Sequence, residues 1–380
     1  MPSPEPPRIL PGDEPGSIAI AAAQLRAGGL VVFPTETVYG LGANALDARA
    51  VARVFAAKER PAFDPLIVHL ADASAIGACA EPADADDPRV ARLAARFWPG
   101  PLTLVLRKRA IIPGIVTAGL PTVGLRVPDH PVARALIRAA GVPVAAPSAN
   151  RFGGLSPTRA AHVVAGLGSR VDLVLDGGRC RVGVESTVVL LAAGRAVLLR
   201  PGGLAVEAIE AEIGPLEVPD DAAPGTAELA PGRAGAHYAP RAPLELADPR
   251  DPAAAGLFAA HLGERVGLLA ASDAGRAVAE AIGGPFAAVE VLDADGDLVG
   301  TAARLFDALH ALDAADLSRI VAEPVGESGL GRAVMDRLRR AARGPLGAGA
   351  DASPGADASA GGAGDAPGGA PAATTRTINR

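Results

Sequence analysis

Three short polar strings lie next to stretches of this chain that favour β-strands, and the ends of strands are where binding groups gather on a sheet. The first string covers residues 34–41 and combines hydroxyls, a carboxylate and glycines, which permit a ligand to approach the backbone closely. This composition suits a binding loop, and it equally suits an ordinary turn in which Thr35 caps the backbone. The residue types alone leave both interpretations open.

The second string places two cations, Lys58 and Arg60, just before Pro61 at the end of an amphipathic helix. A lysine supplies a compact charge and an arginine a two-pronged donor, so the pair can converge on phosphate groups. Cations are also favoured at a helix C-terminus by the helix dipole, without any ligand. Taken alone, this pair favours the dipole interpretation.

The third string contains Ser148 and Asn150, directly after the apolar run 142–146, and Ser156 follows downstream. Hydroxyl and amide groups in such a turn bind a phosphate or a ribose, or they satisfy the backbone of the turn itself. Ser156 and its neighbours are also typical of a helix start.

Three further polar residues, His69, Arg126 and Arg200, stand where the alternation of apolar side chains predicts burial. A buried charge needs a partner, and an anionic ligand serves as well as a carboxylate. For His69, a histidine satisfied within the core is the favoured interpretation.

Short β-rich runs alternate with alanine-rich helical segments from about residue 15 to 213. Strands are expected over 30–34, 66–70, 102–106, 123–127, 142–146, 173–175, 187–191 and 196–200. Helices are expected over 47–57, 89–97, 132–140 and 159–165, the first of them capped by Asp47. This pattern predicts an α/β or α+β domain on a large, twisted, mixed sheet, without giving the order of its strands.

The organisation of the chain changes beyond residue 213. Residues 214–243 are rich in Pro, Gly, Asp and Ala, which is typical of a linker, and the linker carries Tyr238, which either docks in a site or packs the linker down. Strands and helices alternate over 244–343, which favours a small parallel sheet with covering helices. We expect residues 1–14 to be flexible and residues 344–380 to be disordered.

Length and composition limit the class of protein. A chain of 380 residues fits two domains, and with 49% hydrophobic but only 3% aromatic residues its cores must be aliphatic. The net charge of −6 argues against a protein that coats nucleic acid by bulk electrostatics, although it does not exclude a local basic patch such as Arg107 to Arg109.

Several classes of site are excluded by what the sequence lacks. Two cysteines, Cys79 and Cys180, make neither a tetrahedral zinc site nor a disulfide framework, and they fit a reducing compartment, so we expect a cytoplasmic protein. The N-terminus has no signal-peptide pattern, and no apolar run reaches the roughly 18 residues that span a bilayer, so no membrane partner is expected. Neither a P-loop, a zinc-protease motif nor a nucleophile elbow is present.

Taken together, the polar strings resemble the Sua5/YrdC/YciO family, in particular its longer, two-domain Sua5 type. The resemblance extends over roughly residues 15–343 and is strongest before 213. It rests on residues 33–42, 58–60, 65–69, 98–103, 148–150, 200–202 and 237–240. The family implies a YrdC-like catalytic domain with a large twisted mixed sheet over residues 15–213, and a smaller Rossmann-like α/β C-terminal Sua5 domain over 244–343.

The resemblance also implies an activity, the formation of threonylcarbamoyl-AMP and pyrophosphate from L-threonine, bicarbonate and ATP, for the modification of adenosine 37 in transfer RNA. The expected partners are these substrates, a downstream tRNA threonylcarbamoyl transferase complex and, weakly, transfer RNA itself. Mg²⁺ is expected to enter with ATP, and no metal-binding residue of the protein is predicted. The residues that the family places at L-threonine are Thr35, His69, Arg126 and Ser186. Those that it places at ATP are Lys58, Arg60, Thr117, Ser148, Asn150, Ser156, Arg200 and Tyr238, with Lys58 and Arg60 expected to act in catalysis.

Two positions depart from the family pattern. Asp64 stands where the family often has asparagine, which affects one hydrogen bond on the phosphate side, and Ala236 stands where an arginine is common in the linker. The alternative function is that of a non-catalytic protein of the same fold that binds double-stranded RNA or transfer RNA. A second alternative, a carbamoyl-adenylate-forming enzyme that uses carbamoyl phosphate, would carry extra metal-binding or acyl-phosphatase-like segments.

Overall fold

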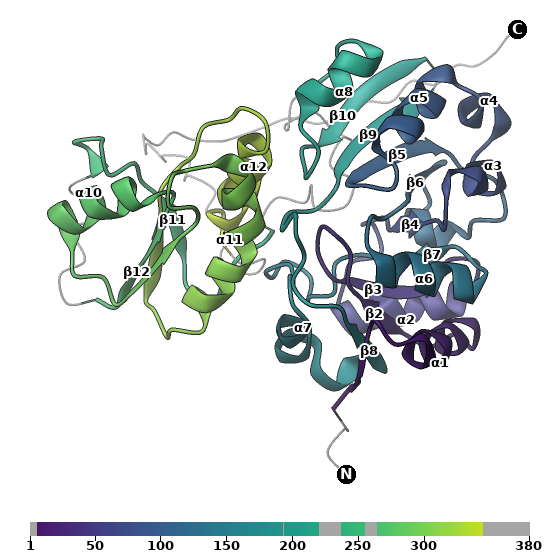
Figure 1. Cartoon of the computed structure of the whole chain (residues 1–380), viewed down its shortest axis with the longest axis horizontal. Helices are drawn as coiled ribbons and strands as arrows, with labels where there is room; N and C mark the ends of the chain where they lie inside the picture. The colour runs from purple at the N-terminus through teal and green to yellow at the C-terminus, as the bar shows by residue number, and fades with distance from the viewer. Residues whose placement is uncertain (1–5, 193, 220–236, 255–263, 345–380) are drawn as a thin grey trace, which may run out of the picture. The chain divides into compact units, whose positions relative to one another are not determined.

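The computed structural model describes residues 6–192, 194–219, 237–254 and 264–344, and their strands form two sheets (Figure 1). The strands of the larger sheet are β1 (Arg8–Pro11), β2 (Val31–Phe33), β3 (Gly40–Asn44), β4 (Ile67–His69), β5 (Leu102–Arg107), β6 (Thr122–Arg126), β7 (Val144–Ala145), β8 (Leu173–Asp176), β9 (Thr187–Ala192) and β10 (Arg195–Arg200). They lie in the order β1-β8-β2-β3-β7-β4-β6-β5-β9-β10. Parallel and antiparallel pairs alternate irregularly, so the sheet is mixed, as predicted.

Helices pack against this sheet. They are α1 (Pro15–Arg26), α2 (Ala48–Lys58), α3 (Ile76–Cys79), α4 (Pro82–Ala85), α5 (Pro88–Phe97), α6 (Pro131–Ala140), α7 (Ala160–Leu167) and α8 (Val206–Ile213). Helix α2 begins where the sequence predicts, because the Asp47 carboxylate accepts hydrogen bonds from the backbone N–H groups of Arg49 and Ala50.

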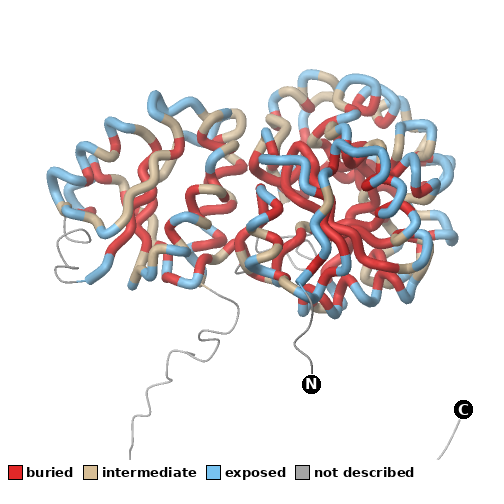
Figure 2. The backbone as a smooth tube through the Cα atoms, turned by 60° about the horizontal axis from the view of Figure 1, so that its bottom comes forward, coloured by how far each residue is buried: buried red, intermediate tan, exposed pale blue. Residues whose placement is uncertain are grey.

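The large sheet has an aliphatic core on each face. Successive side chains of a strand point to opposite faces, and β2 shows this directly. Val32 packs into a core that includes side chains of α2, whereas Val31 and Phe33 pack into a second core with α1 and α6. Figure 2 shows the strands of this sheet in the red of buried residues. The sheet is therefore buried on both sides and forms a rigid frame for the polar side chains at the ends of its strands.

Strand register brings the polar residues of the sequence together. Strands β4 and β6 pair in parallel with His69 opposite Arg126, so that these two residues end neighbouring strands. On the far side of β4 an isolated bridge joins Gly40 to Ser148. The first and third polar strings thus meet on one side of β4, and His69 and Arg126 lie at the ends of β4 and β6.

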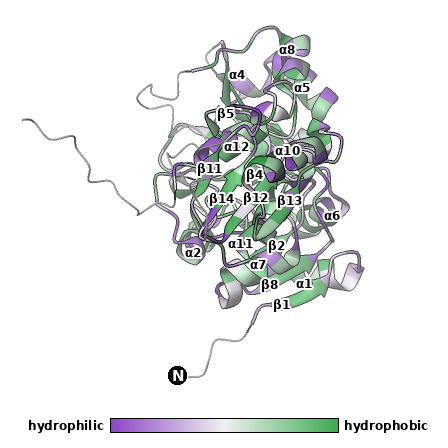
Figure 3. Cartoon of the chain, turned by 90° about the vertical axis from the view of Figure 1, so that its left-hand side faces the viewer, coloured by the Kyte–Doolittle hydropathy of each residue, from purple (hydrophilic) through white to green (hydrophobic). Residues whose placement is uncertain are grey.

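The smaller sheet contains the strands β11 (Leu244–Leu246), β12 (Val266–Ala270), β13 (Ala288–Val291) and β14 (Arg319–Ala322), all parallel, in the order β11-β14-β12-β13. Its helices are α10 (Asp273–Gly283), α11 (Leu298–Asp313) and α12 (Gly331–Ala341). Helix α10 contributes to one core of this sheet, and α11 and α12 contribute to another. Figure 1 shows the helices on the two sides of the strands, and Figure 3 shows the apolar strands in green. The small parallel sheet with covering helices was predicted and is confirmed.

The predicted elements are present, and additional ones appear. Each predicted strand and helix of the larger sheet region lies within two residues of its expected ends. Part of the N-terminal segment that we expected to be flexible is instead ordered, because β1 pairs in parallel with β8. The expected turn over Gly40 and Leu41 is the start of β3, a strand whose Gly42 lies so close to the Phe33 ring that a Cβ atom there would be only 2.7 Å from it. The tail that begins at residue 345 and most of the linker lie outside the described residues.

Within the described part of the chain, no helix is both long and apolar enough to cross a membrane.

Candidate functional site

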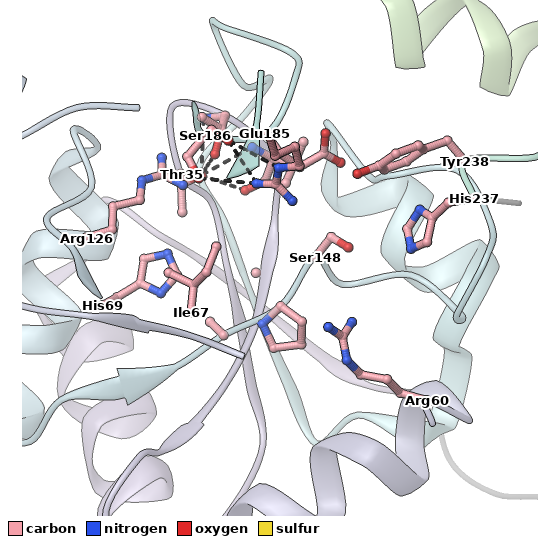
Figure 4. A pocket seen from close by; sticks show the side chains of 16 residues that line it. Thr35, Arg60, Ile67, His69, Arg126, Ser148, Glu185, Ser186, His237 and Tyr238 are labelled. Carbon is pink, nitrogen blue, oxygen red and sulfur yellow. Dashed lines mark hydrogen bonds between the residues drawn. The ribbon is translucent and has the colours of Figure 1, made fainter. Parts of the chain in front are cut away.

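A pocket forms where eight segments of the chain meet, and Figure 4 shows the side chains that line it. Arg126 and His69 lie on one side of the pocket, Arg60 lies on the opposite side, and Ser148 lies between them. The lining residues are Thr35, Thr37, Val38, Gly40, Arg60, Ile67, His69, Arg126, Ala146, Pro147, Ser148, Glu185, Ser186, Arg200, His237 and Tyr238.

The first wall of the pocket is the turn between β2 and β3. The Thr35 hydroxyl donates a hydrogen bond to the Val38 carbonyl at 2.7 Å and accepts weaker bonds from the N–H groups of Thr37 and Val38. The turn interpretation is therefore present in the structure, and Thr35 faces the pocket as well. The side chain both shapes the loop and contributes to the wall.

Arg126 has a buried partner that the sequence analysis did not assign. Its Nη2 atom lies 2.7 Å from Oε1 of Glu36, and both side chains are almost fully buried. Neither of these two atoms makes a hydrogen bond within the described residues. The contact between the two side chains is therefore an ion pair without hydrogen-bond geometry. The Nε atom of Arg126 donates to the Gly100 carbonyl at 3.2 Å. The guanidinium is thus held in place and its charge is balanced before any ligand arrives.

His69 is neutral in this environment. Burial, followed by the nearby charge of Arg126, lowers its pKa from 6.5 to about 3. Its Nδ1 atom makes no hydrogen bond among the described residues. A neutral imidazole beside a paired arginine suits contact with a polar, uncharged part of a ligand.

The opposite wall of the pocket carries positive charge. Arg60 is buried and its Nη2 atom lies 2.8 Å from Oδ2 of Asp64, so the residue that departs from the family pattern forms an ion pair with a predicted phosphate ligand. Lys58 is 1% exposed and donates hydrogen bonds to the backbone carbonyls of Ser148 and Asn150. Lys58 therefore holds the third polar string against the end of α2, and it does not itself line the pocket.

The cations of this wall act together on His237. Burial lowers the pKa of His237 well below its ordinary value, and the next causes are the charges of Arg60, Lys58, Arg200 and Arg337. Four positive charges around one imidazole mark a region of positive potential. Such a region favours an anionic ligand.

Arg200 and Ser186 approach each other closely. The Nη2 atom of Arg200 donates to the Ser186 carbonyl at 2.9 Å, and Gly202 lies directly against the same backbone. A Cβ atom on Gly202 would be 2.3 Å from the carbonyl carbon of Ser186 and from the nitrogen of Thr187. Position 202 therefore requires glycine, because any side chain there would clash with the backbone of Ser186 and Thr187.

Replacing Gly202 by alanine is expected to lower the free energy of unfolding by about 1–3 kcal/mol, because backbone atoms must move to admit the methyl group. Gly166 in α7 is the matched control, since a Cβ there meets nothing within 4 Å. Gly166→Ala should be neutral or stabilising by up to about 1 kcal/mol. Urea denaturation of both variants measures the difference, and equal stabilities would contradict this account.

The structure brings together most, but not all, of the residues that the sequence analysis singled out. Those that line the pocket are Thr35, Arg60, His69, Arg126, Ser148, Ser186, Arg200 and Tyr238. Three others lie in contact with its walls: Lys58 and Asn150 bond to each other, and Ser156 donates to Glu185. Thr117 lies elsewhere, in a turn where its hydroxyl donates to the Leu120 carbonyl at 2.9 Å, and it borders a separate small cavity. The geometry therefore gives Thr117 no place at the pocket.

Sequence reasoning missed two acidic residues. Glu36 lies within the first string, and Glu185 directly precedes Ser186, but neither was given a role. Glu185 lines the pocket and is 7% exposed. The available signal was a carboxylate next to an apolar run, where burial demands a cation.

The side chains of the basic run Arg107 to Arg109 are all engaged in contacts within the chain. Arg107 pairs with Asp84 at 2.6 Å, Lys108 donates to the Ile112 carbonyl, and Arg109 donates to the Gly77 carbonyl. These contacts weaken the case for an RNA-binding surface at this run.

The pocket is narrow. Water-sized molecules can enter about 50 Å³ of it, which is far less than the roughly 300–1,000 Å³ of pockets that hold drug-sized ligands. A nucleotide therefore enters only if side chains in the wall move.

The five histidines of the described residues all have lowered pKa values, mainly through burial. That of His162, which stacks on His310 with ring centroids 3.8 Å apart, falls to about 4, and that of His69 falls to about 3. In the unfolded chain each imidazole takes up a proton near pH 6.5. Below that pH the unfolded state binds more protons than the folded state, so stability falls as the pH falls.

We expect the free energy of unfolding to decrease between pH 7 and pH 5, each buried histidine contributing up to about 1.4 kcal/mol per pH unit. Urea denaturation at both values measures this decrease. The His162→Gln variant should show a shallower dependence on pH than the wild-type chain. A stability that is constant over this range would contradict the lowered pKa values of these side chains.

Comparison with known proteins places these observations in context. Two family models match consecutive parts of the chain. The Sua5/YciO/YrdC model, described as telomere recombination, matches residues 23–202, and a model described as the threonylcarbamoyl-AMP synthase C-terminal domain matches residues 204–343.

Full-length relatives and solved structures are also similar to the chain. The threonylcarbamoyl-AMP synthases of Bacillus subtilis and Pyrococcus abyssi are each 44% identical to it, over 86% of this chain and 93% and 94% of theirs. The structure of Pyrococcus abyssi Sua5 complexed with L-threonine is 42% identical, with a TM-score of 0.77, over 86% of this chain and 94% of that one. A variant of the same protein, with a histidine and a tyrosine replaced by alanine, matches at 41% identity and a TM-score of 0.78, over 89% and 96%.

Proposed function

This chain belongs to the Sua5/YciO/YrdC family, and from this membership and the chemistry of its pocket we propose that it forms threonylcarbamoyl-AMP from ATP, L-threonine and bicarbonate. The observation that carries the proposal is the division of one pocket into two halves. One half holds Arg126 and His69, and the other holds Arg60. Arg200 also lines the pocket, and its charge helps to lower the pKa of Arg60. A solved relative with L-threonine bound supports the amino-acid half.

Threonine fits the half of the pocket that contains Thr35, His69, Arg126 and Ser186. Arg126 would bind the threonine carboxylate, since its Nη2 atom has charge contact with Glu36 but makes no hydrogen bond. Neutral His69 and the hydroxyls would contact the amine and the side-chain hydroxyl, while Ile67 supplies an apolar surface for the methyl group.

ATP fits the positive half of the pocket. Arg60 and Arg200 would bind phosphate oxygens, and Ser148 would contribute a hydroxyl. Lys58 and Asn150 would fix the loop on which Ser148 stands, and Tyr238 would cover the nucleotide. We retain Ser156 as a residue that acts through Glu185, and we assign no contact to Thr117.

Mg²⁺ is best treated as part of the substrate. Among the described residues, no three His, Cys, Asp or Glu side chains gather as a metal site, and the carboxylates at the pocket already face arginines. This donor set fits an ion that is bound mainly by nucleotide phosphates and water, as Mg²⁺ commonly is. The ion would balance phosphate charge as ATP binds.

The reaction requires no protein nucleophile. The threonine amine attacks the carbon of bicarbonate, and loss of water leaves a carbamate. A carbamate oxygen then forms a bond to the α-phosphorus of ATP while the bond from that phosphorus to the bridging oxygen of the β-phosphate breaks, which releases pyrophosphate. The side chains contribute alignment of the two substrates and stabilisation of negative charge on the transferring group.

The labile product would pass to a tRNA threonylcarbamoyl transferase complex, with transfer RNA itself bound weakly if at all by this chain. We place this step in the cytoplasm, where the acceptor RNA is used. The alternative of a non-catalytic RNA-binding protein receives no support from the basic run Arg107 to Arg109, whose side chains are engaged within the chain.

Pyrophosphate release by the purified protein tests the proposal. The reaction should require ATP, Mg²⁺, bicarbonate and L-threonine together, and it should fall to background when threonine is omitted or replaced by serine. Release of pyrophosphate that does not depend on threonine, or no release at all from a folded protein that binds both substrates, would contradict the proposed activity.

A further inference from the structure

A buried arginine of the smaller sheet region contacts three segments of the pocket. Arg337 lies on α12 and is 0% exposed. Its Nε atom donates to Oε2 of Glu185 at 2.8 Å, and its Nη1 atom donates to the Pro201 carbonyl at 3.0 Å. Its guanidinium carbon lies 5.1 Å from the centre of the Tyr238 ring.

These contacts fall directly beside the proposed ATP ligands. Glu185 precedes Ser186, and Pro201 follows Arg200, the residue that donates to the Ser186 carbonyl. One guanidinium therefore fixes the segments on both sides of the Arg200–Ser186 contact and supports the face of the tyrosine that borders the pocket.

The charge of Glu185 depends on the same contact. Burial by itself raises the pKa of this carboxyl, but the charges of Arg337 and Arg200 and the bond from Ser156 outweigh burial and lower the pKa below its ordinary value. Glu185 thus stays ionised in a dry wall. Without Arg337, the remaining strong cation that acts on this carboxylate is Arg200.

We propose that Arg337 is a positioning residue of the ATP half of the pocket, which acts by engaging Glu185 and by holding the Pro201 carbonyl next to Arg200. This inference rests on the proposed function, and it gives the segment that contains α12 a direct part in the site. When the guanidinium is removed, the unpaired Glu185 carboxylate repels the nucleotide phosphates, while Arg126 and Glu36 keep their own ion pair.

Arg337→Met is the first test, with steady-state kinetics for ATP and for threonine and with calorimetric binding of MgATP. We expect the KM and the Kd for ATP to rise roughly 10- to 100-fold, the size of effect that misplaced binding groups produce. The KM for threonine should change less than the KM for ATP, because Ser186 is the one proposed threonine contact that adjoins a residue held by Arg337.

A double variant separates charge from mere packing. In Arg337→Met with Glu185→Gln, the Glu185 carboxylate no longer repels the nucleotide phosphates, so most of the ATP affinity should return. A purely structural role for Arg337 predicts no such recovery.

Asp307→Asn is the matched control for contact between α11 and the larger sheet region. Asp307 pairs with Arg159 and Arg179 at 3.0 Å each, and it is not part of the pocket lining. This variant should keep both KM values within about two-fold of wild type, since additive effects are expected for distant sites.

Three outcomes would overturn the inference: unchanged ATP binding in Arg337→Met, an equal loss in Asp307→Asn, or no recovery in the double variant. If Arg337→Met does not fold, the same comparison is made with Arg337→Lys, which keeps the charge but loses the second donor and should weaken ATP binding less than ten-fold. The wild-type protein measured alongside distinguishes the two ideas: absence of threonine-dependent pyrophosphate release from wild type rejects the proposed function, whereas ATP binding still reports on Arg337.

Discussion

Replacing Arg126 by methionine is expected to lower the rate of threonine-dependent pyrophosphate release about 100- to 1,000-fold, the usual cost of removing one preorganised electrostatic contact. Arg126 is the one guanidinium on the threonine side of the pocket lining, and it would bind the substrate carboxylate. The loss should appear mainly as a weaker affinity for threonine, with ATP binding close to that of wild type.

The Arg126→Met variant alone would mix two effects. It leaves Glu36 buried without its cation, and breaking a buried pair typically costs about 3–5 kcal/mol of stability. The double variant Arg126→Met with Glu36→Gln removes the unpaired charge. It should recover much of the stability measured by urea denaturation while remaining inactive with threonine, and a recovery of activity would contradict the assignment of Arg126.

Replacing Lys58 by methionine is expected to produce the second large effect, a loss of about 100-fold or more in pyrophosphate release. The Nζ atom of Lys58 donates to the carbonyls of Ser148 and Asn150, and methionine leaves both acceptors unsatisfied inside the protein. The loop that carries Ser148 would then shift away from the pocket. The structure therefore predicts loss of ATP affinity together with a lower stability.

The ionisation of Lys58 gives this prediction a specific signature. Burial, and then the charge of Arg60, lowers the pKa of Lys58 well below its ordinary value. Bound phosphates would raise that pKa again, so ATP binding should take up a proton at a pH above the pKa of the free protein, and ATP affinity should fall as the pH rises. Calorimetry in two buffers with different enthalpies of ionisation measures the proton uptake. Equal uptake in wild type and Lys58→Met would contradict a role for this amine.

Helices and central strands of this chain could be predicted from the sequence, because capping residues and runs of apolar side chains mark them locally. Asp47 marks the start of α2, and the apolar runs mark the central strands. Strand β3 was missed because its glycine-rich sequence lacks strand propensity, and it becomes a strand only by pairing with β2 and β7. The order of the ten strands depends on such distant pairings, which leave no periodic signal.

The candidate site likewise contains residues that the sequence predicts and residues that it does not. The polar strings located one side of the threonine half and much of the ATP half, because each string lies next to a buried strand in the sequence. The acidic partners were not foreseen: Glu36 faces Arg126, and Glu185 faces Arg337, which is 152 residues away in the sequence. A contact of that separation is fixed by tertiary packing alone. Asp64, in contrast, was singled out from the sequence as a departure from the family pattern. The structure shows that it is the ion-pair partner of Arg60.

Detection of the product itself tests the central claim most directly. The purified protein would be incubated with MgATP, L-threonine and ¹³C-labelled bicarbonate, and the mixture examined at once by mass spectrometry. We predict an adenylate with the mass of threonylcarbamoyl-AMP that becomes one unit heavier with labelled bicarbonate and disappears when threonine is omitted. Release of pyrophosphate without such a species, or an adenylate that carries no label, would contradict the proposed reaction.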